Sequence, residues 1–432
     1  MAVLATRAWL NGTARRNSTA LAVLLPMLST MGQEALRSAL SIDSVLAERE
    51  NPTVNLNPER PHLGPVQLSY SLYAGLEYDD NINGSQVNPQ SDTLLRGGAG
   101  LGMSWQATER SSLQLGGGLG YVYYVEQTHN SGLEVTPNSA LTWQIGFTDG
   151  SITLYDQFSY SRQVTQESST ANLTTLPRLE NTIGTRVAWE PGRWTLQAGY
   201  GHNDFVATDS TFNYLDRSSE YFFARAGWRF AEGTQAGIEA STTLTSYQHS
   251  SGNDSESYSV GPYADWQVTQ SLRASVRGGP QFYSLSSTAA SANSGLNTSY
   301  YAALNVNHKL THYISQQLNL QRDVSLGLNS ASDYVEQFTA NYSVSWALTQ
   351  RITVGGDITY QHGSQPLLVT VQNVQVFQTE DFDRYGFGVN FSWSITDHLT
   401  ATVHYSYWDR QSNLPDQGYT RNNVGLQVNY GF

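Results

Sequence analysis

Apolar and polar residues alternate along most of the chain from residue 66 to the C-terminus. The clearest example is the last stretch, where glycine and amide residues separate Val424, Leu426, Val428, Tyr430 and Phe432. Successive side chains of a β-strand point to opposite faces, so a period of two predicts strands. Counting these stretches predicts about eighteen strands, each apolar on one face and polar on the other.

Short and long connections alternate between these predicted strands. Eight short turns lie near 107–111, 148–151, 190–193, 231–234, 269–271, 310–313, 348–351 and 396–398. Nine longer polar loops lie near 80–91, 126–136, 164–180, 206–216, 248–257, 286–298, 327–333, 363–380 and 409–419. Both chain ends fall on the short-turn side. This arrangement predicts an all-β fold, a transmembrane antiparallel up-and-down β-barrel with periplasmic termini.

Aromatic residues recur at one depth in this pattern. A tryptophan comes shortly before seven of the short turns, and His308 takes its place in the eighth; the seven are Trp105, Trp143, Trp189, Trp228, Trp266, Trp346 and Trp393. Tryptophan favours a membrane–water interface, because its ring is apolar and its N–H still needs a partner. We therefore expect these residues and the terminal Phe432 to be membrane-interface anchors in an outer membrane. The alternative is a soluble β-propeller, which would need four strands per repeat.

The N-terminal part differs from the rest of the chain. Arg7, Arg15 and Arg16 precede an apolar stretch at 20–28, which predicts a signal peptide at 1–32. A periplasmic lead segment and linker is expected at 33–64, with the outer-membrane β-barrel at 65–432. No later run reaches about 18 apolar residues, so no transmembrane helix is expected.

Composition excludes several classes of function. The chain has no cysteine, which rules out disulfides and thiolate-bound metals. Its net charge of −13 argues against nucleic-acid binding, which needs a basic face. Only 14% of residues are charged, below the usual level of soluble domains. No cofactor is expected.

The face opposite the apolar stripe is expected to line the lumen. Its charged positions are Glu77, Arg96, Arg186, Arg225, Glu239, Asp265, Arg273, Arg277, Lys309 and Asp357. Barrels of 16 to 18 strands enclose an aqueous channel, where such charges set ion preference. Alternatively, opposite charges pair and only fill the lumen. No loop stands out as folding inward. Asp156 falls on the lipid face, which a β-bulge or a position near the interface would explain.

Two local patterns suggest chemistry. The sequence from Asp79 to Gly84, Asp-Asp-Asn-Ile-Asn-Gly, has the spacing of a calcium loop, but Gln90 replaces its last acidic ligand. Asp and Asn also favour ordinary turns, so this pattern leaves calcium binding open. His202, His308 and His404 are candidates for an outer-wall hydrolase site, although no hydrolase motif accompanies them. The sequence favours a protein that is not an enzyme.

Residues 75–82, Gly-Leu-Glu-Tyr-Asp-Asp-Asn-Ile, resemble the opening strand of the β-barrel porin 2 family of Gram-negative outer membranes. The resemblance covers about 66–432 and includes the C-terminal Phe432, which implies contact with the barrel assembly machinery. It also implies a pore, in some members for secreted polysaccharide, with polysaccharide export components as partners. The leading hypothesis is a passive channel for hydrophilic solutes in contact with outer-membrane lipid and lipopolysaccharide. The alternatives are a structural or adhesive barrel with functional surface loops and the lipid hydrolase.

Overall fold

The computed structural model describes residues 61–163, 168–249, 254–286, 296–329, 334–371 and 374–432. These residues form nineteen strands and two short 3-10 helices, η1 (Thr128–Asn130) and η2 (Ser210–Leu215). The strands are β1 (His62–Leu63), β2 (Val66–Asp79), β3 (Asp92–Thr108), β4 (Ser111–Tyr124), β5 (Gly132–Phe147), β6 (Gly150–Gln163), β7 (Thr175–Trp189), β8 (Trp194–Ala207), β9 (Arg217–Ala231), β10 (Thr234–Tyr247), β11 (Ser255–Gln267), β12 (Leu272–Leu285), β13 (Leu296–Lys309), β14 (Ile314–Leu326), β15 (Tyr334–Ala347), β16 (Ile352–Val371), β17 (Val374–Ser394), β18 (Leu399–Ser412) and β19 (Tyr419–Gly431).

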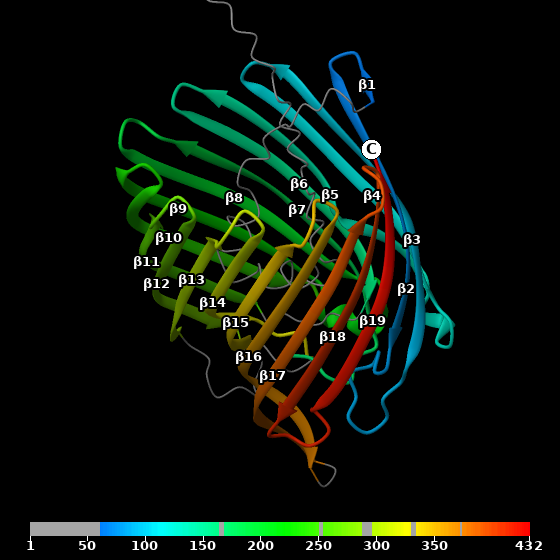
Figure 1. The fold of residues 1–432 in the computed structure, drawn as a ribbon. Helices are drawn as coiled ribbons and strands as arrows, with labels where there is room; N and C mark the ends of the chain where they lie inside the picture. The colour runs from blue at the N-terminus through cyan, green and yellow to red at the C-terminus, as the bar shows by residue number, and fades with distance from the viewer. Residues whose placement is uncertain (1–60, 164–167, 250–253, 287–295, 330–333, 372–373) are drawn as a thin grey trace, which may run out of the picture.

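Strands β2 to β19 form one closed antiparallel ring (Figure 1). Each strand pairs with its neighbour in sequence, and β19 pairs with β2 to close the barrel. The two residues of β1 pair only with the start of β2. The predicted eighteen-stranded up-and-down barrel is confirmed, and the propeller alternative is wrong. The predicted signal peptide and all but the last four residues of the lead segment lie outside the described residues.

Threonine side chains shape five of the eight short turns. In the turn after β15, the Thr349 hydroxyl accepts a hydrogen bond from the Ile352 backbone N–H at 3.0 Å. Thr311 and Thr396 do the same three residues before Ile314 and Leu399, also at 3.0 Å. Thr269 and Thr108 accept instead from the N–H two residues on, that of Ser271 at 3.2 Å and that of Arg110 at 3.3 Å. A threonine that bonds its own turn favours a tight reversal, which explains why the aromatic–x–x–Thr pattern recurs at this end of the barrel.

One predicted loop is absent. Residues 363–380 were expected to form a long outer loop, but β16 and β17 continue through this region as a paired hairpin. The pairs Gln365↔Glu380 and Val371↔Val374 extend the ladder to the tip. The polar residues here suggested a loop, whereas the β-branched and apolar residues at 367–371 favour a strand. Glu380, at the end of the predicted loop, is therefore a strand residue of β17.

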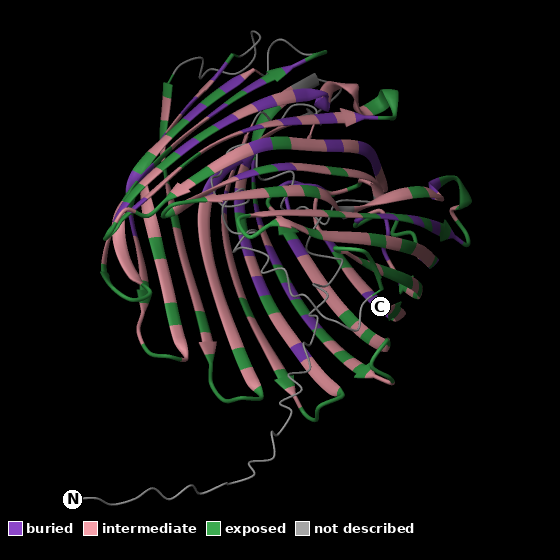
Figure 2. Cartoon of the chain, turned by 90° about the horizontal axis from the view of Figure 1, so that it is seen from above, coloured by how far each residue is buried: buried purple, intermediate pink, exposed green. Residues whose placement is uncertain are grey.

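The two faces of the barrel differ as the alternation predicts, and Figure 2 shows this banding along the strands. The apolar stripe faces outward: Leu72 is 53% exposed, Leu101 74% and Ile238 63%. Tyr155 and Tyr263 on the opposite face are nearly fully buried. Among the described residues, no helix has the length and hydrophobicity needed to cross a membrane.

Asp156 lies on the outer face, midway along β6. It pairs in register with Leu141 and Ile183, and no register shift falls at this position. The Asn181 amide donates a hydrogen bond to its carboxylate at 2.7 Å. A hydrogen bond from the neighbouring strand, rather than either expected explanation, therefore reduces the cost of this carboxylate in an apolar belt.

Candidate functional site: the lumen and its inward-folded loop

Several of the predicted lumen charges are paired across neighbouring strands. The Arg96 guanidinium lies 2.9 Å from the Glu77 carboxylate, and Arg225 lies 2.6 Å from Glu239. Glu239 also accepts a hydrogen bond at 3.1 Å from the hydroxyl of Tyr301, three strands away. Opposite charges thus neutralise one another along this face, as the alternative sequence interpretation allowed.

The other predicted lumen residues occupy separate positions. The Asp265 carboxylate accepts a hydrogen bond from Gln235 at 2.8 Å, and Arg273 donates to Gln267 at 3.2 Å. Asp357 lies directly opposite Gly388, where its carboxylate fills the space that a side chain would need. The remaining three are Arg186 on β7, Arg277 on β12 and the exposed Lys309 at the end of β13. The structure gathers these residues on one face but into no single cluster.

The connection between β6 and β7 crosses the lumen. Its residues Ser168, Ser169 and Thr170 are almost completely buried. The Ser168 hydroxyl donates to Gln337 on β15 at 3.0 Å, although β6 and β15 are nine positions apart in the ring of eighteen. Strands so placed lie on opposite sides of a barrel. The segment at 168–172 therefore extends inward and lies across the channel.

A cluster of buried polar side chains on the opposite wall of the barrel holds this segment. Arg410 on β18 donates to the Ser168 carbonyl at 2.8 Å, and Gln365 on β16 donates to the Ser169 carbonyl at 2.7 Å. Arg410 also forms an ion pair with Glu380 at 2.9 Å, and both side chains are fully buried. Gln365 and the Ser412 hydroxyl each donate to Glu380 at 2.7 Å. Buried charges need partners, and these contacts fix the position of the loop.

Two further outer segments meet the crossing loop. Leu328, between β14 and β15, packs with Phe205 of β8, with Leu215 of η2 and with Leu176 of β7. The Tyr214 hydroxyl donates to the Leu328 carbonyl at 3.1 Å, and burial raises the pKa of this phenol. Tyr214 therefore stays a neutral donor. Together, these contacts form an apolar junction inside the outer half of the barrel.

The expectation that no loop stands out as folding inward was wrong. The segment at 168–172 is short and polar, like the other outer loops, and its partners lie far away in the sequence. The available signal was on the strands opposite, where Arg410, Glu380 and Gln365 place polar groups that need buried partners. Sequence alone does not show which loop satisfies them.

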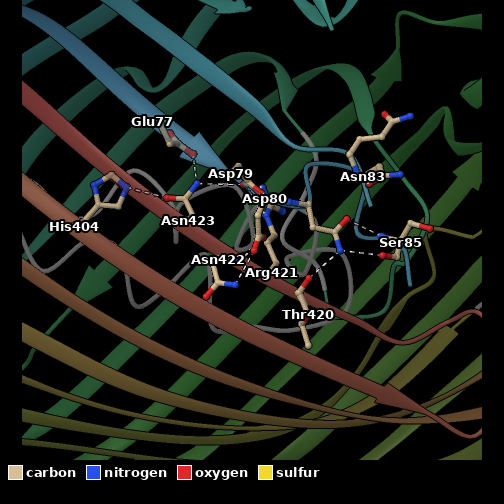
Figure 3. A network of polar contacts seen from close by, with 12 residues as sticks. Glu77, Asp79, Asp80, Asn83, Ser85, His404, Thr420, Arg421, Asn422 and Asn423 are labelled. Atoms are coloured by element: carbon tan, nitrogen blue, oxygen red, sulfur yellow. Dashed lines mark hydrogen bonds and ion pairs between the residues drawn. The ribbon is translucent and has the colours of Figure 1, made fainter. Parts of the chain in front are cut away.

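The calcium-like sequence forms a network at the join between β2 and β19 (Figure 3). Asp79 accepts from Arg421 and forms an ion pair with it at 2.5 Å, and Asp80 accepts from the Asn422 backbone and side chain at 2.6 and 2.7 Å. Asn81 donates to the Thr420 carbonyl at 2.8 Å. Across the described ranges, no group of three or more His, Asp or Glu residues could hold a metal ion. The acidic residues of this sequence hold β2 and β19 together.

The side-chain contacts of His202 and His404 are with carboxylates and an amide. His202 contacts the carboxylates of Glu220 at 2.7 Å and Asp204 at 3.2 Å. His404 contacts the Asn423 side chain at 3.1 Å, and His308 lies opposite Gln316. Carboxylate and amide partners do not supply the hydroxyl that a hydrolase needs.

The predicted interface anchors lie near the short-turn end. Six of the seven tryptophans are exposed, and the remaining one, Trp228, packs edge-on against Trp194 with ring centroids 5.0 Å apart. Phe432 stacks on Tyr70 at 5.6 Å and on His398 at 4.0 Å. Their proposed role at a membrane interface remains a prediction.

No family model matches the chain, and no curated protein matches it. Solved structures similar to this chain include OccAB3 of Acinetobacter baumannii, with 12% identity over 86% of this chain and 100% of that one, and a TM-score of 0.46. Others are OccAB2 of the same species, at 9% identity over 86% and 98% with a TM-score of 0.48, and OpdQ of Pseudomonas aeruginosa, at 11% over 85% and 98% with a TM-score of 0.46.

The architecture itself defines the class of protein. In lipid, strands cross only as a closed barrel, because every backbone group must be paired. A closed ring of eighteen strands with an apolar outer face is such a barrel. The chain is an outer-membrane β-barrel protein of a Gram-negative bacterium.

Proposed function

We propose that this protein is a passive channel for small hydrophilic solutes, with its narrowest part at the segment 168–172. The supporting observation is that this segment crosses the lumen and is fixed to the far wall through Arg410 and Gln365. A barrel of this size is wide enough to hold water, and a fixed polar loop inside it limits the size of what passes.

The crossing segment weighs against export of a polysaccharide, the narrower function considered from the sequence. A polymer needs an uninterrupted wide path, whereas the β6–β7 loop, η2 and Leu328 all extend into this lumen. The adhesive alternative relies on free outer loops, and two of these loops are instead engaged inside the barrel.

Conductance across planar bilayers tests the proposal. The folded protein should open discrete channels, and absence of channel events from well-folded protein would refute the proposal. The double variant Arg410→Met with Glu380→Met removes the anchor without leaving a buried charge unpaired. Release of the loop should raise the single-channel conductance by about twofold or more. Arg351→Gln, in a short turn at the opposite end, should leave conductance unchanged.

A further inference from the structure

The barrel wall splits between β13 and β14. Their ladder runs from Lys309↔Ser315 to Ala302↔Arg322 and stops there, although both strands continue. Beyond this point β13 stays paired with β12 up to Leu296, and β14 stays paired with β15 up to Leu326. The outer parts of the two strands therefore separate, between the labels β13 and β14 in Figure 1.

The end of β14 lies on the inner side of β12. Val324 and Leu326 belong to the outward-facing set of β14, which lower in the strand includes Leu318 and Leu320. Both are nevertheless buried, and they pack with Tyr283 and Leu285, which belong to the inward-facing set of β12. The outer face of one strand thus contacts the inner face of another, so the two edges of the wall overlap.

Side chains bridge the split. Arg322 donates to the Tyr300 carbonyl at 2.5 Å and to the Ser299 hydroxyl at 3.0 Å, and its guanidinium lies 3.8 Å from the centre of the Tyr300 ring. It also forms an ion pair with Glu336 of β15 at 2.7 Å. The Tyr283 hydroxyl, from the inner side, donates to the same Glu336 at 3.4 Å. Inner-face and outer-face groups therefore meet within the split.

Arg322 and Tyr300 lie at a depth in the membrane where a charge that faces lipid is energetically costly. Arg322 is eight residues beyond the start of β14, and its neighbour Tyr300 is 54% exposed on the outer face. At roughly 3.3 Å per residue on a tilted strand, this places the guanidinium in the outer-leaflet half of the membrane. An arginine on the lipid face is destabilising unless it has partners, which here come from both edges of the split.

We propose that this split is a lateral portal through which a single-chain amphiphile with an anionic head group passes between the outer leaflet and the lumen, with Arg322 as the binding residue for the head group. The planar guanidinium suits a carboxylate, sulfonate or phosphate, which would take the place of Glu336. The apolar residues Tyr283, Leu285, Val324 and Leu326 offer a path for the alkyl chain. Backbone hydrogen bonds do not have to break for these side chains to part.

The crossing loop explains why a route through the side wall would be needed. The junction around Leu328 narrows the axial route in the outer half of the barrel, directly beyond the end of β14. A molecule that partitions into the outer leaflet would reach the lumen through the side wall. This proposal is independent of the aqueous channel, because its ligand and its route both differ.

The first test locks the split. The chain has no cysteine, so Leu285→Cys with Leu326→Cys introduces the only two thiols, within one packed cluster. Vesicles containing this variant and trapped albumin receive a pyrene-labelled long-chain alkyl sulfonate, which does not cross bilayers as a neutral acid. Oxidation should slow transfer to the albumin by about tenfold or more, because the open state is removed, and reduction should restore it. The pair Ala224→Cys with Ala240→Cys, on the paired strands β9 and β10, is the matched control.

The second test addresses the head-group residue. Arg322→Gln should raise the half-saturating concentration of the alkyl sulfonate by about tenfold, because a charge-assisted pair is lost. Arg322→Lys should restore part of the loss, since it keeps the charge but not the planar fork. Arg351→Gln is the control.

Three outcomes would overturn the portal: transfer by the unmodified protein no faster than in protein-free vesicles, equal transfer by the locked and reduced forms, or an unchanged concentration dependence in Arg322→Gln. Potassium chloride conductance, measured on the same vesicles fused to planar bilayers, reports the aqueous channel separately. Loss of conductance with intact sulfonate transfer would refute the channel alone.

Discussion

The barrel wall is held together differently at two of its joins, the one between β2 and β19 and the one between β13 and β14. The two ladders are similar in length, with nine residue pairs from Asn423↔Asp79 to Gly431↔Ser71 and eight from Ala302↔Arg322 to Lys309↔Ser315. Their outer ends differ. The first ends in a dense polar network, and the second separates and is bridged by side chains alone.

Connectivity explains this difference. A short turn joins β13 to β14, so their register is fixed at one end even where the other end opens. No turn joins β2 to β19, since they come from opposite ends of the barrel sequence. Their register depends on side chains, and Asp79, Asp80 and Asn81 supply the specific pairing with β19 that a turn would otherwise give. A polar side-chain network therefore holds the outer end of the β2–β19 join, whereas the proposed opening lies at the outer end of the β13–β14 join.

The largest effect is expected at the first join. Asp79→Ala should lower the free energy of unfolding by about 3 kcal/mol, because it leaves the Arg421 charge partly buried without its carboxylate. Urea unfolding in lipid vesicles, followed by tryptophan fluorescence, measures this change. The double variant Asp79→Ala with Arg421→Met should recover part of the stability. A loss below about 0.5 kcal/mol, as for surface substitutions, would show that the network does not hold the join.

A smaller effect is expected at the split. Leu326→Ala should lower the free energy of unfolding by about 2 kcal/mol, at the low end for a buried leucine, because the unpaired end of β14 can move into the space. The same variant should speed transfer of the alkyl sulfonate, since it weakens the cluster that seals the split. Leu318→Ala, on the paired part of β14, should leave transfer unchanged. Equal acceleration by both variants would argue against a local opening.

Much of the fold could be predicted from the sequence, because the period of two and the aromatic-before-turn pattern are local. The inward loop could not, because Ser168 meets Gln337 and Arg410 from the opposite wall. The split could not either: Val324 and Leu326 return to the outward apolar alternation of β14 after a single charged position, Arg322. Only their burial against β12 reveals that the strand has turned inward. Ion pairs between the two strands of one hairpin, such as Glu77 with Arg96, are intermediate in how far the sequence predicts them. The alternation places both residues on the inner face but does not show that they pair.

The smallest effect is expected at the short-turn end of the first join, where Phe432 completes the pairing. Its backbone N–H donates to the Tyr70 carbonyl at 3.0 Å, and its ring stacks between Tyr70 and His398. Phe432→Ala keeps the backbone bond and loses the stack, so the free energy of unfolding should fall by about 1 kcal/mol.

The control is Tyr430→Ala, which removes a more loosely tilted neighbour, 6.3 Å from Tyr70, and should cost less. If Phe432→Ala instead matched the effect of Asp79→Ala, ring stacking would hold this join as strongly as the buried ion pair. The polar network would then not be the main interaction that holds the first and last strands together. Equilibrium unfolding of the three variants in the same vesicles decides between these outcomes, because refolding yield is then separated from stability.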